Sequence, residues 1–251
     1  MCKIKLYTPQ MNERNDSFSL CLDFYSMPSF RDDFVKSAKE KLNFGGFAER
    51  LLTEYEKQLI DIDSICSVLN NSIDEIISKK VYKLEHLNIE NGNVDLYVSP
   101  YFVFVYCEWN NDNKDAFNVL APIIDLLKER KLDMDIQNIA FTMNFKIGTD
   151  NANLWKIFDP NAFPTFDEST MTTGRYADSH QYDSAIVDLV RDVRIGVNEM
   201  QDGQIIEPWY FVHIKSVGNL LNAGRFFKEN SIELLEDLYK KTRDEATKCF
   251  M

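Results

Sequence analysis

The fold of this chain follows from two segments of similar pattern, Ser99-Pro100-Tyr101-Phe102-Val103-Phe104-Val105 and Glu207-Pro208-Trp209-Tyr210-Phe211-Val212-His213. In each, a proline precedes aromatic and β-branched residues, which are typical of a β-strand. Because proline has no backbone N–H to donate, each run should begin a strand or lie at a sheet edge. The prolines are 208 − 100 = 108 residues apart. The spacing indicates one arrangement used twice.

The sequence around the first segment predicts a strand, three helices, three strands and a helix. Residues 18–24 alternate large apolar and smaller residues, as a half-buried strand does. Helical spacing of apolar residues covers 29–79, and Gly45-Gly46 reads as a junction between two of the helices. Three strands should follow, and Asn91-Gly92 suits a tight turn between the first two, at 81–89, 94–98 and 101–109. Pro122 should divide or kink a helix over 112–130.

The sequence around the second segment predicts a similar order. Its clearest strand is 139–147, where Ile139, Phe141, Met143, Phe145 and Ile147 should be buried, with Thr142 and Lys146 facing water. A short helix should follow at 153–158. We expect three more strands, the last two joined through the turn at Gln201-Asp202-Gly203, and then a long helix, at 175–182, 186–198, 205–217 and 231–249.

This order of elements predicts an α+β fold with antiparallel sheets covered by helices. We interpret it as an internal duplication of a β-α-βββ-α unit. The first unit would span residues 1–131, with its extra helices at about 29–79, and the second 132–251. Both units should belong to one compact globular body.

Composition narrows the classes of function. The chain has 251 residues and a formal net charge of −12, from 40 acidic and 28 basic residues. This balance argues against binding to nucleic acid, which needs a surplus of Lys and Arg. The five cysteines have no metal-type spacing, and no stretch resembles a signal peptide or a membrane span. We therefore expect a cytoplasmic protein without disulfides, metal or membrane association.

One stretch resembles a known group of proteins. Val98-Ser99-Pro100-Tyr101, the strand at 139–147, Leu154-Trp155-Lys156-Ile157-Phe158-Asp159-Pro160 and the helix at 232–250 occur here in that order. In this the chain is similar to an uncharacterised, sporadically distributed bacterial protein family of similar length. The resemblance implies a shared fold and brings no activity with it.

A candidate ligand site lies in the second half. Asp178, His180 and Tyr182 would project from one face of a strand, where they could transfer protons if a pocket lay above them. Arg175 and Arg194 could hold an anion beside them. The alternative is the solvent face of an edge strand, with the arginines in cross-strand ion pairs.

A candidate partner surface consists of aromatic residues, because Tyr and Trp give rigid contact area with a polar tip. Its candidates are Tyr101, Trp109, Trp209 and Tyr210. The alternative is that these side chains are core, since the Val and Phe residues between them require a buried face.

The sequence contains no recognisable catalytic or cofactor motif. Asp61 with Asp63, and Asp133 with Asp135, lack a third ligand or a calcium-loop glycine, and no Gly-x-Ser-x-Gly elbow occurs. The leading hypothesis is a non-catalytic, cytoplasmic protein-interaction domain, consistent with a bacterial defence or toxin-neutralising module, whose partner and oligomeric state the sequence does not identify. The alternative is an enzyme or small-molecule-binding domain with a cleft near Asp178, His180 and Tyr182.

Overall fold

Two central strands, β2 (Asp16–Phe24) and β7 (Ile136–Thr149), show the alternation that the sequence predicts. The buried apolar positions of both strands face one core, and they are Phe18, Leu20, Leu22 and Phe24 of β2 and Ile139, Phe141 and Met143 of β7. Thr142 is half-buried, on the other face of the sheet. The predicted buried face of this strand is therefore confirmed up to residue 143, but Thr142 is not open to water as predicted, and the side chains of Phe145, Lys146 and Ile147 lie outside the described residues.

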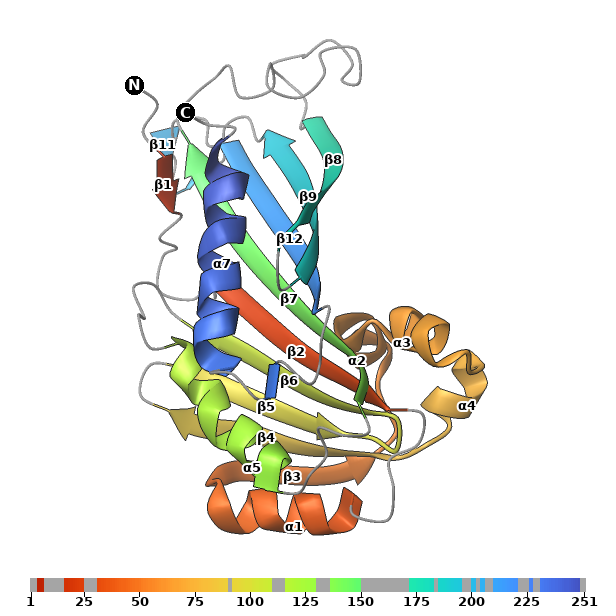
Figure 1. The fold of residues 1–251 in the computed structure, drawn as a ribbon. Helices are drawn as coiled ribbons and strands as arrows, with labels where there is room; N and C mark the ends of the chain where they lie inside the picture. Colours follow the sequence, from red (N-terminus) through yellow and green to blue (C-terminus); the bar gives the residue numbers. More distant parts are fainter. Residues whose placement is uncertain are drawn as a thin grey trace.

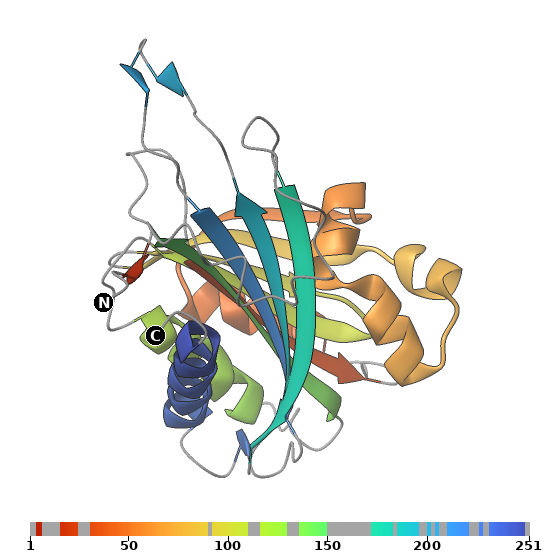
Figure 2. The same ribbon diagram turned by 90° about the horizontal axis from the view of Figure 1, so that it is seen from above.

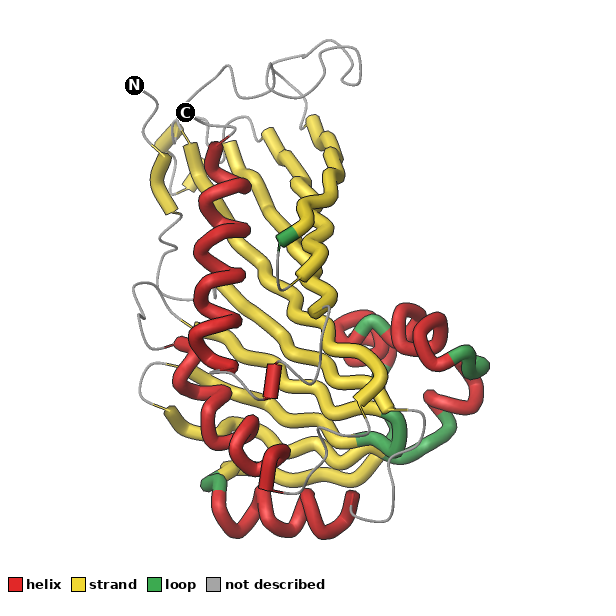
Figure 3. The backbone as a smooth tube through the Cα atoms, in the orientation of Figure 1, coloured by secondary structure: helices red, strands yellow, loops and turns green. Residues whose placement is uncertain are grey.

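The computed structural model describes residues 4–6, 16–24, 31–89, 92–109, 116–129, 136–149, 172–182, 185–195, 200–201, 204–205, 210–220, 226–227 and 231–248. Figure 1 shows the fold, and Figure 3 shows the strands as one continuous sheet with helices on both sides. The structure is an α+β fold, as the sequence predicts. The expected helix at 153–158 lies outside the described residues.

The main sheet is antiparallel at every described pairing. Its order is β3-β4-β5-β6-β2-β7-β12-β9-β8, and the short β1 (Ile4–Leu6) also pairs with β7. The remaining bounds are β3 (Phe44–Arg50), β4 (Val81–Ile89), β5 (Gly92–Val98), β6 (Phe102–Trp109), β8 (Thr172–Gln181), β9 (Ala185–Ile195) and β12 (Tyr210–Leu220). A separate hairpin joins β10 (Met200–Gln201) to β11 (Gln204–Ile205). Since β2 pairs with β7, the two predicted units share one sheet.

The strand order is the same on both sides of this central pair: β2-β6-β5-β4 on one side and β7-β12-β9-β8 on the other. The phase of the aromatic runs differs. Phe102 and Phe104 of β6 pack on one face of the sheet. In β12, Tyr210 and Val212 lie opposite Thr149 and Ile147, and alternation from buried Met143 places these positions on the opposite face.

Helices cover the two faces unequally (Figures 1 and 2). On one face lie α1 (Arg31–Lys41), the 3₁₀ turn η1 (Ala116–Leu120), α5 (Ala121–Glu129) and α7 (Ser231–Lys248). Pro122 lies in the first turn of α5, directly after η1, so the predicted division of this helix is confirmed. The other face carries α2 (Glu54–Ile60), α3 (Ile62–Leu69) and α4 (Ile73–Ile77), which pack on β5 and β6.

The prediction for the segment around Gly45-Gly46 was wrong. Residues 44–50 form the edge strand β3, not a helix or a helix junction. Gly46 lies opposite Glu85 of β4, and a Cβ at Gly46 would come within 3.1 Å of Glu85 Oε2 and 3.3 Å of its Cβ. The missing side chain therefore leaves room for Glu85, and pairing with β4 outweighs the helix-like spacing of the local apolar residues.

Candidate functional site

The helices α2, α3 and α4, which pack on β5 and β6, form a helical lobe, defined here as residues 51–78. Local capping explains why they form. Thr53 and Glu56 make a capping box at the start of α2, and Ser72 accepts a hydrogen bond from the N–H of Glu75 at the start of α4. Asp61, with φ of 59°, ends α2 and begins α3. The sequence pattern alone would also allow Asp63 or Ser64 as the cap of α3, but its N-cap is Asp61, two residues before Asp63.

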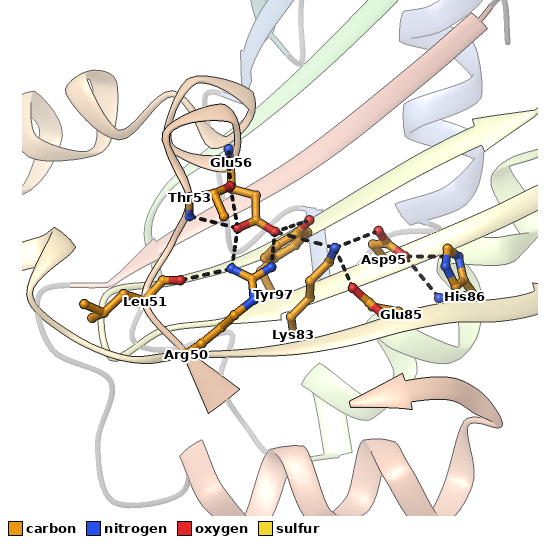
Figure 4. Close-up of polar contacts among 9 residues, drawn as sticks. All are labelled: Arg50, Leu51, Thr53, Glu56, Lys83, Glu85, His86, Asp95 and Tyr97. Carbon is orange, nitrogen blue, oxygen red and sulfur yellow. Dashed lines mark hydrogen bonds and ion pairs between the residues drawn. The ribbon is translucent and has the colours of Figure 1, made fainter. Parts of the chain in front are cut away.

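Glu56 anchors the lobe to the sheet (Figure 4). Its side chain is nearly fully buried and accepts two hydrogen bonds from the Arg50 guanidinium, at 2.6 and 2.7 Å. The backbone N–H of Thr53 donates to Oε2 at 3.0 Å, and the Tyr97 hydroxyl donates to Oε1 at 3.3 Å. This one carboxylate therefore joins β3, the start of α2 and β5.

Lys83 of β4 extends this network along the sheet (Figure 4). Its Nζ lies 2.8 Å from Glu85 Oε1, 3.5 Å from Glu56 Oε1 and 3.7 Å from Asp95 Oδ2. The backbone N–H of His86 donates to Asp95 Oδ1 at 3.0 Å, where β4 departs from regular register and His86 has φ of 55°. The Asp95 carboxylate thus holds both Lys83 and the irregular backbone at His86.

The protonation states of this network suit binding and structure better than proton transfer. Burial alone would raise the pKa of Glu56, but hydrogen bonds from Arg50 and Thr53 outweigh it and lower that pKa to about 2. Burial lowers the pKa of Lys83, and the bond to Glu85 with the nearby Tyr97 raises it overall above its usual value. Burial also raises the pKa of Tyr97. Near neutral pH none of the three exchanges a proton readily.

Exposed apolar side chains gather on the lobe. Among the described residues, six large apolar side chains are classed as exposed, and four belong to the lobe: Leu51 (52%), Tyr55 (67%), Val68 (41%) and Ile73 (45%). Of the other two, Phe47 stacks on Tyr82 and has the Lys39 ammonium 3.1 Å from its ring centroid. The apolar spacing of the sequence would place Phe47, Leu51 and Tyr55 together on the buried side of one helix, yet all three are exposed. In α2 the buried pair is Glu56 and Ile60, spaced by four residues.

The lobe surface is also acidic. Its exposed carboxylates are Glu54, Asp61, Asp63, Asp74 and Glu75, and the single cation within residues 51–78 is Lys57. Five negative charges and one positive charge leave 5 − 1 = 4 negative charges on this surface. The flanking cations are Arg50, which directly precedes the lobe and is paired with buried Glu56, and Lys79 and Lys80, which lie where the chain leaves α4 for β4.

The register separates the residues of the candidate ligand site. Asp178 and His180 occupy alternate positions of β8, and the half-buried rings of His180 and Tyr182 are stacked with their centroids 6.5 Å apart. Arg175 lies opposite Asp192, and Arg194 lies opposite Thr173. Alternation therefore puts both arginine positions on the other face of the sheet from positions 178 and 180, so the strands do not bring the five residues to one face.

Of the four candidate partner residues, Tyr101 alone has a side chain that the structure describes. Tyr101 is buried, and its hydroxyl donates to Glu75 Oε1 at 2.8 Å, so it fastens α4 to the sheet and is not part of an open surface. Trp209 lies outside the described residues. Trp109 pairs with Asp16 and Gly92, and Tyr210 with Thr149 and Ile195, but their side chains are not described.

No protein-family model, curated protein or solved structure matches this chain. The helices within the described ranges include none with the length and apolar character to cross a membrane. In the same part of the chain, no three His, Cys, Asp or Glu side chains come together as ligands for a metal ion. Cys21, Cys66 and Cys107 are free thiols.

Proposed function

We propose that this protein is a non-catalytic protein-interaction domain whose contact surface is the helical lobe. The observation that carries the proposal is that four of the six exposed large apolar side chains of the described residues lie in residues 51–78: Tyr55, Val68 and Ile73 on the three short helices and Leu51 just before them. Exposed apolar side chains gathered in one region, with polar residues around them, are typical of protein contact sites. Tyrosine adds a ring with a polar tip, which is favoured at such sites.

The attachment of the lobe supports this role. Ile60, Ile62, Ile65, Leu69 and Ile76 pack with Phe102 and Phe104 in a second core. The bonds Tyr97–Glu56 and Tyr101–Glu75 add polar contacts from the sheet to two of the helices. A surface held in this way loses little conformational freedom when it binds, which favours affinity.

The proposal extends to the cellular setting that the sequence suggests. We propose that the domain acts in the cytoplasm, without catalytic activity, as part of a bacterial defence or toxin-neutralising module. Support comes from the acidic composition and from the ion network around Glu56, whose groups keep one protonation state near neutral pH.

Affinity capture with matched variants tests the function. Tyr55→Ser combined with Val68→Ser removes two exposed apolar side chains from the lobe, and Ile186→Ser removes one from β9 as the control. We expect a protein captured from the native host by the wild-type chain and by the control, and lost with the lobe variant. Equal capture by all three proteins would place the contact elsewhere and overturn the proposal.

We also propose that the two halves are an internal duplication. The shared orders β2-β6-β5-β4 and β7-β12-β9-β8 support it, because two unrelated halves would have no reason to repeat the same connectivity. The opposite phase of the aromatic runs means that the register of β12 against β7 is shifted by an odd number of residues relative to that of β6 against β2. Superposition of β2-β6-β5-β4 on β7-β12-β9-β8 in an experimental structure tests this: strands of the two sets that do not overlap would contradict the proposal.

A further inference from the structure

The charge around the exposed apolar residues points to the chemistry of the partner. We infer that the helical lobe binds a basic, amphipathic helical segment of another protein; this inference rests on the proposed function. Such a segment presents apolar side chains on one face and Lys or Arg beside them. Its apolar face would contact Leu51, Tyr55, Val68 and Ile73, and its cations would face the exposed carboxylates.

Exposed carboxylates occur on all three helices of the lobe. Glu54 precedes exposed Tyr55 in α2, and Asp74 follows exposed Ile73 in α4. Asp63 lies in the first turn of α3, the helix that carries Val68. In α2 and α4 an acidic residue is therefore adjacent in sequence to an exposed apolar one, whereas in α3 Asp63 lies five residues before Val68. Opposite charges across an interface raise the association rate and select among partners, so exposed carboxylates on the lobe favour a basic partner.

The same charge disfavours other occupants. A second copy of this chain docking through its lobe would bring two surfaces of four negative charges each together, which costs energy as they approach. An anionic lipid surface or a nucleic acid would meet the same repulsion. A basic segment of a different protein is the occupant that both the apolar residues and the charges favour.

Two synthetic probes test the inference with the full chain. Both are amphipathic helical peptides of about 15 residues with the same leucines at helical spacing, one with lysine and one with glutamate on the polar face. Fluorescence anisotropy measures their affinity. We expect the lysine peptide to bind and to weaken roughly fivefold or more from low to high salt, because screening reduces its attraction to the carboxylates. The glutamate peptide should not bind measurably.

Charge variants give the matched control. Asp63→Asn with Asp74→Asn neutralises two exposed residues of the lobe, and Glu233→Gln with Asp237→Asn neutralises two exposed residues of α7. We expect the lobe variant to weaken binding of the lysine peptide roughly tenfold and the α7 variant less than twofold. Circular dichroism checks that each variant is folded. Equal weakening by both variants would show attraction to overall charge and overturn the inference.

Tyr55→Ser with Val68→Ser separates failure of the inference from failure of the proposed function. If the glutamate peptide binds as well as the lysine peptide and this variant abolishes both interactions, the lobe is a contact surface but the partner is not basic. If this variant binds the lysine peptide as tightly as wild type, the exposed apolar residues take no part, and both the inference and the proposed function fail.

Discussion

The two faces of β2 are packed in different ways. On one face Phe18 stacks on Phe117 with ring centroids 4.9 Å apart and lies 5.7 Å from Phe141; the two charged residues that are buried in the described part of the chain, Asp23 and Glu56, are on the other face. On the other face the Cys21 thiol donates to Asp23 Oδ1 at 3.2 Å, and Asn138 Nδ2 donates to Asp23 Oδ2 at 2.9 Å. Apolar packing therefore stabilises the first face, whereas the second face is stabilised by apolar packing together with directional hydrogen bonds.

The difference explains where a binding surface can form. On the first face the large apolar residues of the sheet are buried beneath α5 and α7, so they are not available to a partner. The lobe on the second face consists of three short helices, so each buries few residues and leaves others exposed. Hydrogen bonds to Glu56 and Glu75 then supply attachment that the smaller apolar contact does not.

The largest expected effect tests the apolar face. Phe141→Ala should lower the free energy of unfolding by about 3–5 kcal/mol, because it removes a fully buried ring that contacts Phe18 and Phe117 and leaves a cavity. Thr142→Ala, on the other face of the same strand, should cost less than about 1 kcal/mol. Urea denaturation measures both. Similar midpoints for the two variants would contradict the assignment of the two faces.

The second effect tests the anchor of the lobe. Glu56→Gln should cost about 2–3 kcal/mol at pH 7, since it leaves Arg50 and Lys83 with one fewer charged partner. The folded-state pKa of Glu56, about 2, lies below its usual value of 4.5, so its contribution is complete above about pH 4.5 and is lost as pH falls toward 2. The difference between variant and wild type should shrink over that range.

Exposed Glu54 provides the control for this prediction. It pairs with Lys57 within one turn of α2, and Glu54→Gln should cost no more than about 0.5 kcal/mol. Denaturation curves collected from pH 7 to pH 2 compare the two substitutions. A difference for Glu56→Gln that is unchanged at pH 2 would mean that ionisation of this carboxyl does not hold the lobe.

A smaller effect tests the contact between Tyr101 and Glu75. Tyr101→Phe removes only the hydroxyl and should cost about 1 kcal/mol, the usual contribution of one hydrogen bond. Hydrogen exchange should show the loss locally, with faster exchange of the amides of α4 than in the wild-type chain. Unchanged exchange in α4 would show that this bond does not fasten the helix.

The smallest effect on stability is expected where the effect on binding is largest. Tyr55→Ser and Val68→Ser should each change the free energy of unfolding by less than about 1 kcal/mol, because Tyr55 is largely exposed and Val68 is 41% exposed. Thermal unfolding measures this. A loss of several kcal/mol would mean that these side chains contribute to the fold, and the exposed apolar residues would no longer distinguish the lobe from the apolar face.

Local patterns in the sequence were sufficient for several elements. Alternation in β2 and β7 predicted which residues are buried, since strand geometry alone sends neighbouring side chains to opposite faces. The meander β4-β5-β6 and the division at Pro122 followed equally from turn residues and from the chemistry of proline. These features depend on residues that are close together in the chain, so they can be predicted from a single sequence.

The other features depend on residues far apart in the chain. Residues 44–50 have apolar spacing that suits a helix, yet pairing with β4, whose Glu85 fills the space beside Gly46, makes them a strand. The partners of Glu56 likewise come from β3 and β5, so its burial has no local signal. Once Glu56 and Ile60 face the sheet, Tyr55 must face outward. The exposed lobe surface is thus a product of tertiary packing, because only the docking of α2 selects which side of that helix meets water.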